Sequence, residues 1–464
     1  MIPYPAYKST DLPWLPKIPE RWEIKKLRNL LSSFSSKNRP EMPLLSVVRE
    51  KGVVLRDVSS KEENHNYIPD DLSNYKLVKR GQFVMNKMKA WQGSYGISEY
   101  DGIVSPAYFV FDLHGVMPSF FHRAIRSKQY VPYFGQASDG IRVGQWDLSI
   151  PRMKEIPFAV PPLPEQEQIV RYLDSMTAKI NKLIRAKKKQ IALLQEQRQA
   201  IINQAVTKGL DPNAEMKDSC IDWIGEIPKD WRMPHLSFLT TKIGSGKTPR
   251  GGAEIYQESG VRFIRSQNVY FNRLVTDNLQ YISESIDATM PSTRVLKDDV
   301  LLNITGASIG RCCVYRSELR ANVNQHVCII RCRKKLIIPD FLASVLYSHI
   351  GQEAIARCQN EGNRESLTFP QIGAFFIPLP SIEEQKRILA SIDGKTRPIE
   401  DTIERINKEI DLLGEYKQSL VSSLVTGQID VRNIPVEDVF SDDLIAEDDP
   451  TTEIEDEPTN ESEE

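Results

Sequence analysis

A glycine-rich segment in the second half of the chain is the first candidate for chemistry. Residues 244–248 read Gly-Ser-Gly-Lys-Thr, which is similar to the end of a phosphate-binding P-loop. The full GxxxxGK[ST] pattern needs glycine at position 241, where Thr241 stands, and Pro249 follows at once. Because the glycines that let backbone amides surround a phosphate are incomplete, we interpret this segment as a polar loop.

The residue sets of other catalysts are also incomplete. A base methyltransferase needs an Asn/Asp-Pro-Pro-aromatic segment and a glycine-rich cofactor turn, and the sequence contains neither. A metal-dependent nuclease needs clustered carboxylates with a lysine, and Asp70 and Asp340 have no convincing partner. The six cysteines form no CxxC pair and the six histidines no HExxH motif. We therefore predict no catalytic residue, no metal site and no cofactor bound by this chain.

Loops that mix cations, amides and aromatic residues recur in both halves of the chain. Arg and Lys bind guanine edges, Asn and Gln bind adenine edges, and both types contact phosphates. A solvated turn explains any single loop, and Trp91 and Trp146 are equally compatible with a core position. The recurrence of the loops nevertheless predicts contact with double-stranded DNA. The residues predicted to bind DNA are Lys87, Lys89, Trp91, Gln92, Arg142, Gln145, Lys242, Lys247, Arg250, Arg265, Gln267, Asn268, Ser308, Arg311, Asn324, Gln325, Asn363 and Arg364.

The formal charge of −2 conceals an uneven distribution. Residues 434–464 hold fourteen Asp and Glu and no Lys or Arg. Without them, 60 Lys and Arg stand against 48 Asp and Glu, a formal charge of about +12. A basic body fits a polyanionic partner. We interpret the acidic segment as a disordered, solubilising tail, with competition against DNA for the basic surface as the alternative.

Hydropathy and cysteine usage indicate the compartment. The sequence contains no run of eighteen apolar residues, so we expect no transmembrane helix and no membrane contact. Residues 1–17 lack the basic-then-apolar pattern of a signal peptide. Six cysteines without a paired spacing predict no disulfide framework. We therefore expect a cytoplasmic protein.

Two long helices are predicted because one stretch occurs twice, as residues 161–211 and, 219 positions later, as residues 380–430. Apolar residues recur every seven positions, and Lys187, Arg198 and Lys417 interrupt the rows. This period produces a narrow seam that needs a partner helix, and the simplest partner for each copy is the other copy. Taken alone, the pattern also fits an oligomerisation helix. The predicted seam residues are Leu173, Ile180, Ile184, Ile191, Leu194, Ile201, Ile392, Ile399, Ile403, Ile406, Ile410, Leu413 and Leu420.

Glycine and proline mark where these helices should end or break. Gly209 and Gly427 lie just past the two ends, where a left-handed residue closes a helix. Pro398 lies inside the second copy, where proline removes a hydrogen bond and clashes with the preceding turn. We therefore expect a short helix near 383–393, a break, and then a long helix with Thr396 as its N-cap.

The globular regions are duplicated as well. Lys8, Trp14, Ile18-Pro19 and Trp22 recur 209 residues later, and further matches follow at offsets of 217 and 219. The strand-like runs 78–86 and 295–303, and 102–113 and 322–332, with short helices at 120–130 and 341–356, predict an α+β fold in each half. The predicted parts are a first globular domain at 1–160, a helical spacer at 161–210, a second globular domain at 211–379, a helical spacer at 380–433 and the acidic tail at 434–464.

Several segments resemble the specificity (S) subunits of type I restriction–modification systems, a resemblance that covers residues 7–433. The most specific segments are Pro-Pro-Leu-Pro-Glu-Gln-x-x-Ile at 161–169 and Ile-Pro-Leu-Pro-Ser-Ile-Glu-Glu-Gln-x-x-Ile at 377–388. The pieces Ala-Trp-Gln-Gly at 90–93 and Thr-Gly-Ala-Ser-Ile-Gly at 305–310 are also typical. The acidic tail departs from the family pattern.

The resemblance implies two tandem mixed α/β target recognition domains, each followed by a long helix, with the two helices packed as an antiparallel coiled coil of pseudo-two-fold symmetry. Each domain would read one half of a split, asymmetric DNA target. The helices would set the gap and dock two modification subunits, which bind S-adenosylmethionine and methylate adenine. Two restriction subunits would add ATP- and Mg-dependent translocation and cleavage.

Three other hypotheses remain open at the level of the sequence. The chain could serve a related type II system, which the partner genes would distinguish. A self-contained nuclease or modification enzyme would require a cofactor motif that the sequence lacks. A coiled-coil scaffold without a DNA role predicts that charge reversal at Lys87, Lys89 and Arg142 leaves function intact.

Overall fold

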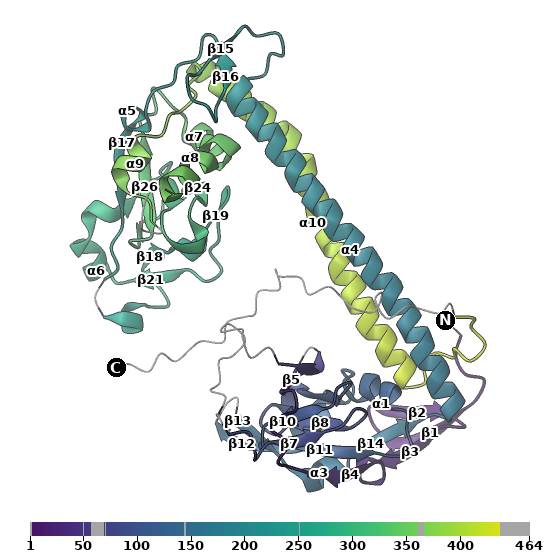
Figure 1. Ribbon diagram of the computed structural model, residues 1–464. Helices are drawn as coiled ribbons and strands as arrows, with labels where there is room; N and C mark the ends of the chain where they lie inside the picture. Colours follow the sequence, from purple (N-terminus) through teal and green to yellow (C-terminus); the bar gives the residue numbers. More distant parts are fainter. Residues whose placement is uncertain are drawn as a thin grey trace. The chain divides into compact units, whose positions relative to one another are not determined.

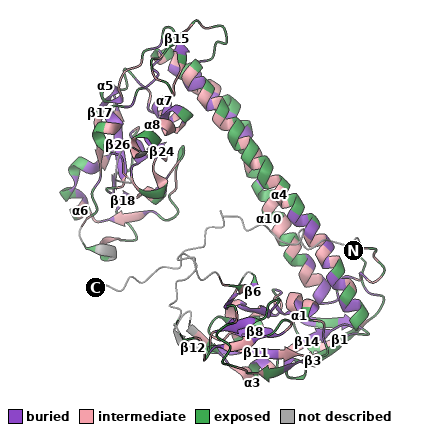
Figure 2. Ribbon diagram, in the orientation of Figure 1, coloured by how far each residue is buried: buried purple, intermediate pink, exposed green. Residues whose placement is uncertain are grey.

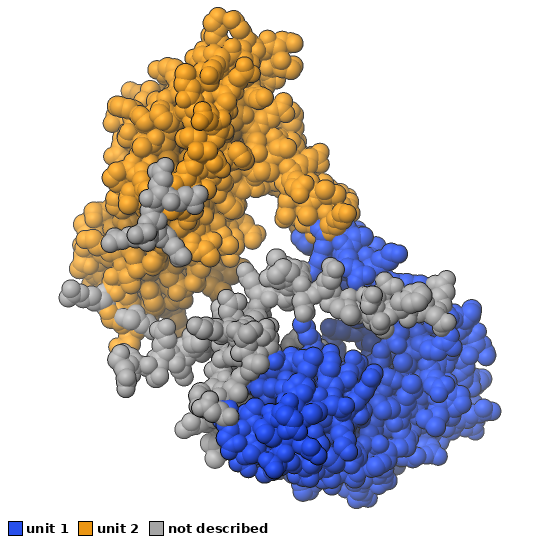
Figure 3. Space-filling view, viewed as in Figure 1, with its two compact units in different colours: residues 1–188, 407–464 blue, residues 189–406 orange. Residues whose placement is uncertain are grey.

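The structure is a computed structural model. It describes residues 2–49, 51–56, 69, 71–142, 145–249, 251–360 and 366–436. The chain divides into two compact units (Figure 3): unit 1 comprises residues 1–188 and 407–464, and unit 2 comprises residues 189–406. The unit boundary crosses the two long helices, α4 (Leu163–Lys208) and α10 (Ile382–Val425). Each unit therefore contains one globular part and a portion of each helix.

Unit 1 is built around a four-stranded antiparallel sheet of order β4-β11-β8-β9, flanked by short two-stranded sheets. Its short helices are η1 (Leu27–Asn29), η2 (Ala90–Gln92), α1 (Pro118–Ile125), α2 (Val131–Gln136) and α3 (Ile150–Lys154). Its strands are β1 (Tyr7–Leu12), β2 (Leu15–Pro19), β3 (Glu23–Lys26), β4 (Leu31–Phe34), β5 (Leu45–Val48), β6 (Gly52–Leu55), β7 (Lys76–Val78), β8 (Phe83–Asn86), β9 (Tyr95–Ile97), β10 (Gly102–Val104), β11 (Tyr108–Leu113), β12 (Ser138–Arg142), β13 (Gln145–Leu148) and β14 (Pro157–Val160).

Unit 2 contains the equivalent antiparallel sheet, β17-β26-β23-β24, and a second sheet of order β21-β18-β25-β22. Its short helices are α5 (Leu236–Leu239), η3 (Gly252–Ile255), η4 (Ser266–Asn268), α6 (Glu284–Thr289), η5 (Pro291–Thr293), η6 (Gly306–Ser308), α7 (Pro339–Tyr347), α8 (His349–Asn360) and α9 (Phe369–Gly373). Its strands are β15 (Met216–Asp218), β16 (Glu226–Pro228), β17 (Thr240–Ser245), β18 (Val261–Ile264), β19 (Val269–Tyr270), β20 (Arg273–Leu274), β21 (Gln280–Ile282), β22 (Arg294–Val295), β23 (Val300–Asn303), β24 (Cys312–Val314), β25 (Ala321–Val323) and β26 (Val327–Cys332).

The duplication predicted from the sequence is confirmed in the strand order of the two main sheets. Figure 1 labels strands of each sheet, such as β8 and β11 in unit 1 and β17 and β26 in unit 2. Each unit also contains a parallel pairing. In unit 1 this is the bridge between Leu44 and Ile103, and in unit 2 it is the pair β18–β25. The predicted strands 102–113 and 322–332 each form two strands with a turn between them. The mixture of antiparallel sheets and short helices in each unit confirms the α+β class.

Apolar faces of the short helices close the core of each unit. In α1, Phe120, Phe121, Ala124 and Ile125 are almost completely buried, and Pro118 occupies the first turn. This spacing of four places all four side chains on one helix face, which packs with Phe83 of the main sheet. Figure 2 shows central strands of the main sheets, such as β8 and β26, as largely buried.

The repeated sequence motifs meet each other in space. In unit 1 the indole N–H of Trp22 donates to Glu165 Oε1 at 2.8 Å, and in unit 2 that of Trp231 donates to Glu384 Oε1 at 3.1 Å. All four groups are buried or half-buried, where an unpaired donor is costly. The repeated Ile-Pro-x-x-Trp and Glu-Gln motifs therefore join the start of each long helix to its globular part.

The glutamines of the same motif form a second joint. Gln166 Oε1 accepts from the backbone N–H of Met117 at 2.7 Å, and its amide donates to Pro161 O at 2.7 Å. Gln385 makes the matching bonds to Ile338 N at 2.8 Å and Pro380 O at 3.1 Å. In each unit this side chain satisfies backbone groups at the start of α1 or α7, where helices have unpaired donors.

The residues that interrupt the predicted apolar rows pair the two long helices. In unit 1, Lys187 pairs with Glu409, and Lys417 Nζ donates to Asn181 Oδ1 at 3.1 Å. As numbers rise along α4, partner numbers fall along α10, so the segments are antiparallel. In unit 2, Arg198 Nε donates to Glu400 Oε1 at 2.8 Å, and Ile202 and Ile392 line one cavity.

The burial of the predicted seam residues agrees with this pairing. Six of them are buried, namely Leu173, Ile180, Ile392, Ile399, Ile406 and Leu420. The other seven are half-buried, namely Ile184, Ile191, Leu194, Ile201, Ile403, Ile410 and Leu413. The regular side-chain interlocking of a coiled coil stays a prediction.

The predicted break at Pro398 is wrong, because α10 runs from Ile382 to Val425 without interruption. Ile392 and Ile399, on either side of the break, are both 8% exposed. Their burial outweighs the missing hydrogen bond. By contrast, Gly209 and Gly427 close the two helices with φ of 72° and 71°, as predicted.

Replacing Pro398 should stabilise unit 2. Pro398 is exposed, so Pro398→Ala restores a backbone donor without changing the packed face. A proline inside a helix costs about 3 kcal/mol relative to alanine, and we expect about 1–3 kcal/mol of added stability. Calorimetric melting measures it. A melting temperature equal to or below that of the wild type would show that the proline is unstrained in α10.

Candidate DNA-recognition surfaces

In unit 1 the structure brings together two loops that the sequence analysis treated separately. The Trp91 and Trp146 rings lie 5.1 Å apart with an interplanar angle of 37°. Lys87 Nζ lies 2.5 Å from Asp147 Oδ2, and Leu148 N donates to Lys87 O at 3.2 Å. Aromatic stacking and an ion pair therefore join the segment after β8 to the β12–β13 hairpin.

The cations of this unit 1 surface differ in their surroundings. The charge of Lys87 is partly compensated by Asp147, whereas Lys89 is exposed and has no ion pair within the described residues. Gln92 is half-buried at the end of η2. Arg142 and Gln145 face each other in the hairpin register, and their side chains lie outside the described part of the chain.

In unit 2 four predicted loops converge through backbone hydrogen bonds. Gly246 N donates to Asn324 O at 3.2 Å, and Asn324 N donates to Ile264 O at 3.0 Å, directly before Arg265. Ile304 N donates to His326 O at 3.0 Å. The loops after β17, β18, β23 and β25 therefore form one continuous surface, which we call the unit 2 loop surface.

The side chain of Asn303 joins two of these loops by hydrogen bonds. Its side chain is fully buried, and its amide donates to Ser266 O at 2.8 Å and to Ser308 Oγ at 3.1 Å. This use of the amide leaves the Ser308 hydroxyl engaged within the protein. Asn303 therefore positions the loops that carry Arg265, Gln267 and Ser308.

Close packing explains the glycine-rich segment better than phosphate binding does. A Cβ added to Gly246 would lie 1.7 Å from Val323 O, so only glycine allows this approach of two backbones. The segment continues from β17 without a helix at Lys247 or Thr248, whereas a P-loop leads into a helix N-terminus. Thr248 donates instead to Gln325, which places Lys247 beside the unit 2 loop surface.

Some predicted DNA-binding residues have other surroundings. Lys242 donates to the carbonyl of Ser292, and burial and the nearby Arg331 lower the pKa of its ammonium group. Asn268 is 1% exposed, accepting from Arg265 N at 3.0 Å and donating to Val275 O at 3.1 Å. Its amide thus shapes the loop. Arg250, Asn363 and Arg364 lie outside the described residues.

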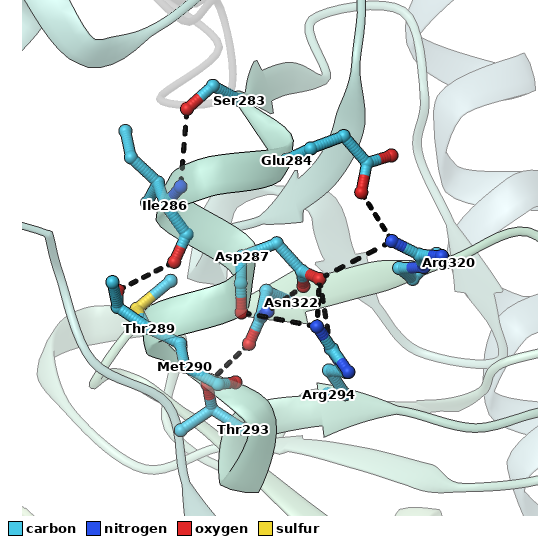
Figure 4. A network of polar contacts seen from close by, with 10 residues as sticks. All are labelled: Ser283, Glu284, Ile286, Asp287, Thr289, Met290, Thr293, Arg294, Arg320 and Asn322. Carbon is cyan, nitrogen blue, oxygen red and sulfur yellow. Dashed lines mark hydrogen bonds and ion pairs between the residues drawn. The ribbon is translucent and has the colours of Figure 1, made fainter.

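A buried carboxylate lies at the centre of the polar network drawn in Figure 4. Asp287 of α6 is fully buried; Arg294 Nε donates to its Oδ2 at 2.9 Å, and the amide of Asn322, also fully buried, donates to its Oδ1 at 2.5 Å. Arg320 adds an ion pair to Asp287 at 3.7 Å. Asn322 lies in β25, two residues before Asn324, so this network fixes the strand that ends in the loop surface.

Removing this carboxylate should destabilise unit 2. In Asp287→Ala the buried amide of Asn322 loses its acceptor, and an unsatisfied buried donor costs about 1–3 kcal/mol. We expect a melting temperature several degrees below that of the wild type in calorimetry. Glu284→Ala is the matched control, because Glu284 pairs with Arg320 at the surface and exposed pairs contribute little. Equal melting of both variants would contradict the supporting role.

Sequence reasoning missed the aromatic partners of these loops. The guanidinium carbons of Arg273 and Arg311 lie 5.5 and 4.8 Å from the ring centroid of Tyr270. The guanidinium carbon of Arg265 lies 5.7 Å from the ring centroid of Tyr256. The segment Tyr-Phe-Asn-Arg at 270–273 could have been recognised as a tight hairpin turn. Asparagine favours positive φ in tight hairpins, and Asn272 has a φ of 62°.

Within the described residues, no three His, Cys, Asp or Glu side chains gather closely enough to hold a metal ion. No helix in that part of the chain has the length and apolar character needed to cross a membrane.

Comparison with known proteins relates this geometry to a family. Residues 19–193 and 228–412 both match the model for the type I restriction modification DNA specificity domain. The specificity subunit of the type I restriction enzyme EcoBI of Escherichia coli is 28% identical over 291 residues, 61% of this chain and 60% of that protein's length. The MjaVIII specificity subunit of Methanocaldococcus jannaschii is 23% identical over 90% of this chain and 95% of its own.

A solved structure shares the fold. A chain described in work on complex assembly and conformational transition of the type I R-M system superposes with a TM-score of 0.61 at 16% identity, covering 89% of this chain and 99% of its own. The two family matches together span well over half of the sequence and contain the corresponding sheets of both units. The chain therefore belongs to the family of type I restriction–modification DNA specificity subunits.

Proposed function

We propose that this chain recognises DNA for a type I restriction–modification complex, with each unit reading one half of a split, asymmetric target. The observation that carries the proposal is the unit 2 loop surface, where backbone hydrogen bonds join four polar loops that are far apart in sequence. Unit 1 joins its own polar loops differently, through Trp91 and Trp146. Equivalent sheets with different loops suit two different half-sites.

The catalytic functions of the complex belong, in this proposal, to partner subunits. Relatives of this chain are named as specificity subunits of type I restriction enzymes. Two modification subunits would bind S-adenosylmethionine and methylate adenine, and two restriction subunits would use ATP and Mg²⁺. In this proposal the chain determines which DNA sequence the complex binds, and the complex acts in the cytoplasm.

The long helices would space the half-sites and dock the modification subunits. Leu193 and Leu412 occupy matching positions of the repeat and are 56% and 62% exposed. Exposed apolar side chains at equivalent positions favour two copies of one partner, since a repeated surface binds a repeated ligand. The coiled-coil scaffold hypothesis accounts for these helices but not for the polar loop surfaces.

Selection from a random duplex DNA library tests the recognition role. The full chain, together with its modification subunits, should enrich a sequence with two specified parts separated by unspecified bases. Binding should weaken steeply as salt rises, because phosphate contacts release counterions. Enrichment of a single uninterrupted sequence, or of none, would contradict the proposal.

A further inference from the structure

Nine arginines of unit 2 form two groups, one with and one without a carboxylate partner. In the first group each guanidinium has a carboxylate partner, in the pairs Arg198–Glu400, Arg294–Asp287, Arg316–Asp340, Arg320–Glu284, Arg331–Asp299 and Arg357–Glu353. In the second group, Arg265, Arg273 and Arg311 lie over tyrosine rings. Within the described residues, none of these three side chains makes a hydrogen bond or an ion pair.

A tyrosine ring holds an arginine in a particular way. The ring contacts the face of the guanidinium and leaves the N–H groups in its plane available. The side chain is then ordered before it binds, which lowers the entropy cost of binding. A stacked guanidinium with unused donors therefore suits recognition of an external acceptor, whereas an ion-paired one has its donors engaged.

Arg265 lies in a groove whose lining suits nucleobases. The groove has a volume of about 600 Å³ and is lined by Tyr256, Gln257, Glu258, Leu279, Gln280 and Tyr281 together with Arg265. Arg265 Nε is buried there without a hydrogen-bond partner. Gln280 lies on β21, opposite Phe263 of β18, so its amide and the guanidinium line the same groove from adjacent strands.

Arg273 and Arg311 form a different arrangement around one ring. Their guanidinium carbons lie 5.5 and 4.8 Å from the centroid of Tyr270, so two positive charges share one aromatic partner. A phosphate bound beside this ring would be attracted by both charges. The β19–β20 hairpin is held in place, since Asn272 N donates to Cys312 O at 2.9 Å and the ring of Phe271 lies 4.8 Å from that of Tyr347.

We propose a division of labour within unit 2: Arg265 reads a guanine in the half-site, Gln280 contacts a base beside it, and Arg273 and Arg311 bind DNA phosphate. Arg is the side chain that pairs bidentately with guanine O6 and N7, and Gln suits adenine. Tyr256 and Tyr270 are the positioning residues. This inference rests on the proposed function and assigns the specificity of one half-site to named side chains.

The base-reading part is tested with Arg265→Lys in the full chain bound to its modification subunits, using the target duplex and its single-base variants. Lysine keeps the charge but loses the planar fork. We expect discrimination at one guanine to fall about 5- to 150-fold, the value of one bidentate contact. All other positions, including the whole half-site read by unit 1, should keep their preference. Tyr256→Leu should give a smaller loss at the same base.

The phosphate-binding part has a different signature. Arg273→Ala and Arg311→Ala should weaken binding to the target and to its single-base variants by the same factor. Each should also reduce the slope of log affinity against log salt by about 0.9, the value for one phosphate contact. Arg262→Ala is the matched control, because Arg262 lies on β18 and donates to Ser317 Oγ at 3.2 Å; removing its charge should change neither property.

The outcomes separate this inference from the proposed function. If the wild-type complex recognises a split target but Arg265→Lys discriminates every base as before, the assignment of Arg265 is wrong and the proposed function stands. If Arg273→Ala or Arg311→Ala alters base preference, the division of labour is wrong. If the wild-type complex has no split target, the proposed function itself fails. Circular dichroism of each variant confirms that it is folded.

Discussion

Exchanging residues 23–155 for the matching segment of another family member changes one half of the recognised DNA sequence and leaves the other half as it was. The exchanged segment carries the unit 1 loops around Lys87, Trp91 and Trp146, whereas Glu165 and the rest of α4 stay native. We therefore expect a complete change of one half-site, with the same gap between the halves. Sequencing of methylated adenines in a host carrying the exchanged chain and its modification subunits measures both.

The junctions between the exchanged segment and the native chain should tolerate a foreign sequence, for a physical reason. The segment starts with β3, which pairs with β14 through backbone hydrogen bonds from Glu23–Val160 to Lys26–Pro157. Backbone pairing does not depend on side-chain identity, so a foreign β3 should still pair with native β14. The reciprocal control exchanges residues 232–376 and should change the other half-site. A change in both halves, or in neither, from either exchange would show that a half-site is not read by one unit.

Lengthening the helix pair widens the gap between the two half-sites. Four residues inserted near Gln195 in α4 add about 6 Å of helix, which corresponds to one or two base pairs of DNA. Because Arg198 pairs with Glu400 in unit 2, four matching residues near Ile403 in α10 keep both helices in register. Four residues turn a helix by about 400°, so the apolar seam is displaced by only about 40°.

A two-residue insertion at the same sites is the control. It turns each helix by about 200° and carries the seam to the opposite face. We expect that variant to lose stability and recognition together, while the four-residue variant keeps both half-sites and changes only the gap. The methylated motif reveals the gap directly. A four-residue variant that methylates the original motif with the original gap would contradict the spacer role.

The duplication, the α+β class and the long helices were predictable because each depends on a pattern that repeats in sequence. Lys187, Arg198 and Lys417 were recognised as interruptions of the apolar rows, and the structure shows that all three pair α4 with α10. The continuity of α10 through Pro398 was not predictable from local preference, since it depends on burial of Ile392 and Ile399.

The loop surfaces were predictable in composition but not in arrangement. Arg265 and Arg311 are both recognisable as candidate DNA ligands, but they belong to loops separated by more than forty residues. Their common feature, a tyrosine beneath each guanidinium, depends on contacts such as that of Arg311 with Tyr270. Asn268 shows the opposite case, because its candidate amide is used inside its own loop. Such distinctions depend on tertiary contacts that no spacing in the sequence contains.

The most direct test of the recognition role is methylome sequencing of a host that expresses this chain and its neighbouring methyltransferase gene, each alone and both together. We expect methylated adenine at a split, asymmetric motif only when both are present, because in our proposal this chain determines the DNA sequence and the partner carries out the methylation. Methylation of the same motif without this chain, or no motif when both are expressed, would contradict the account.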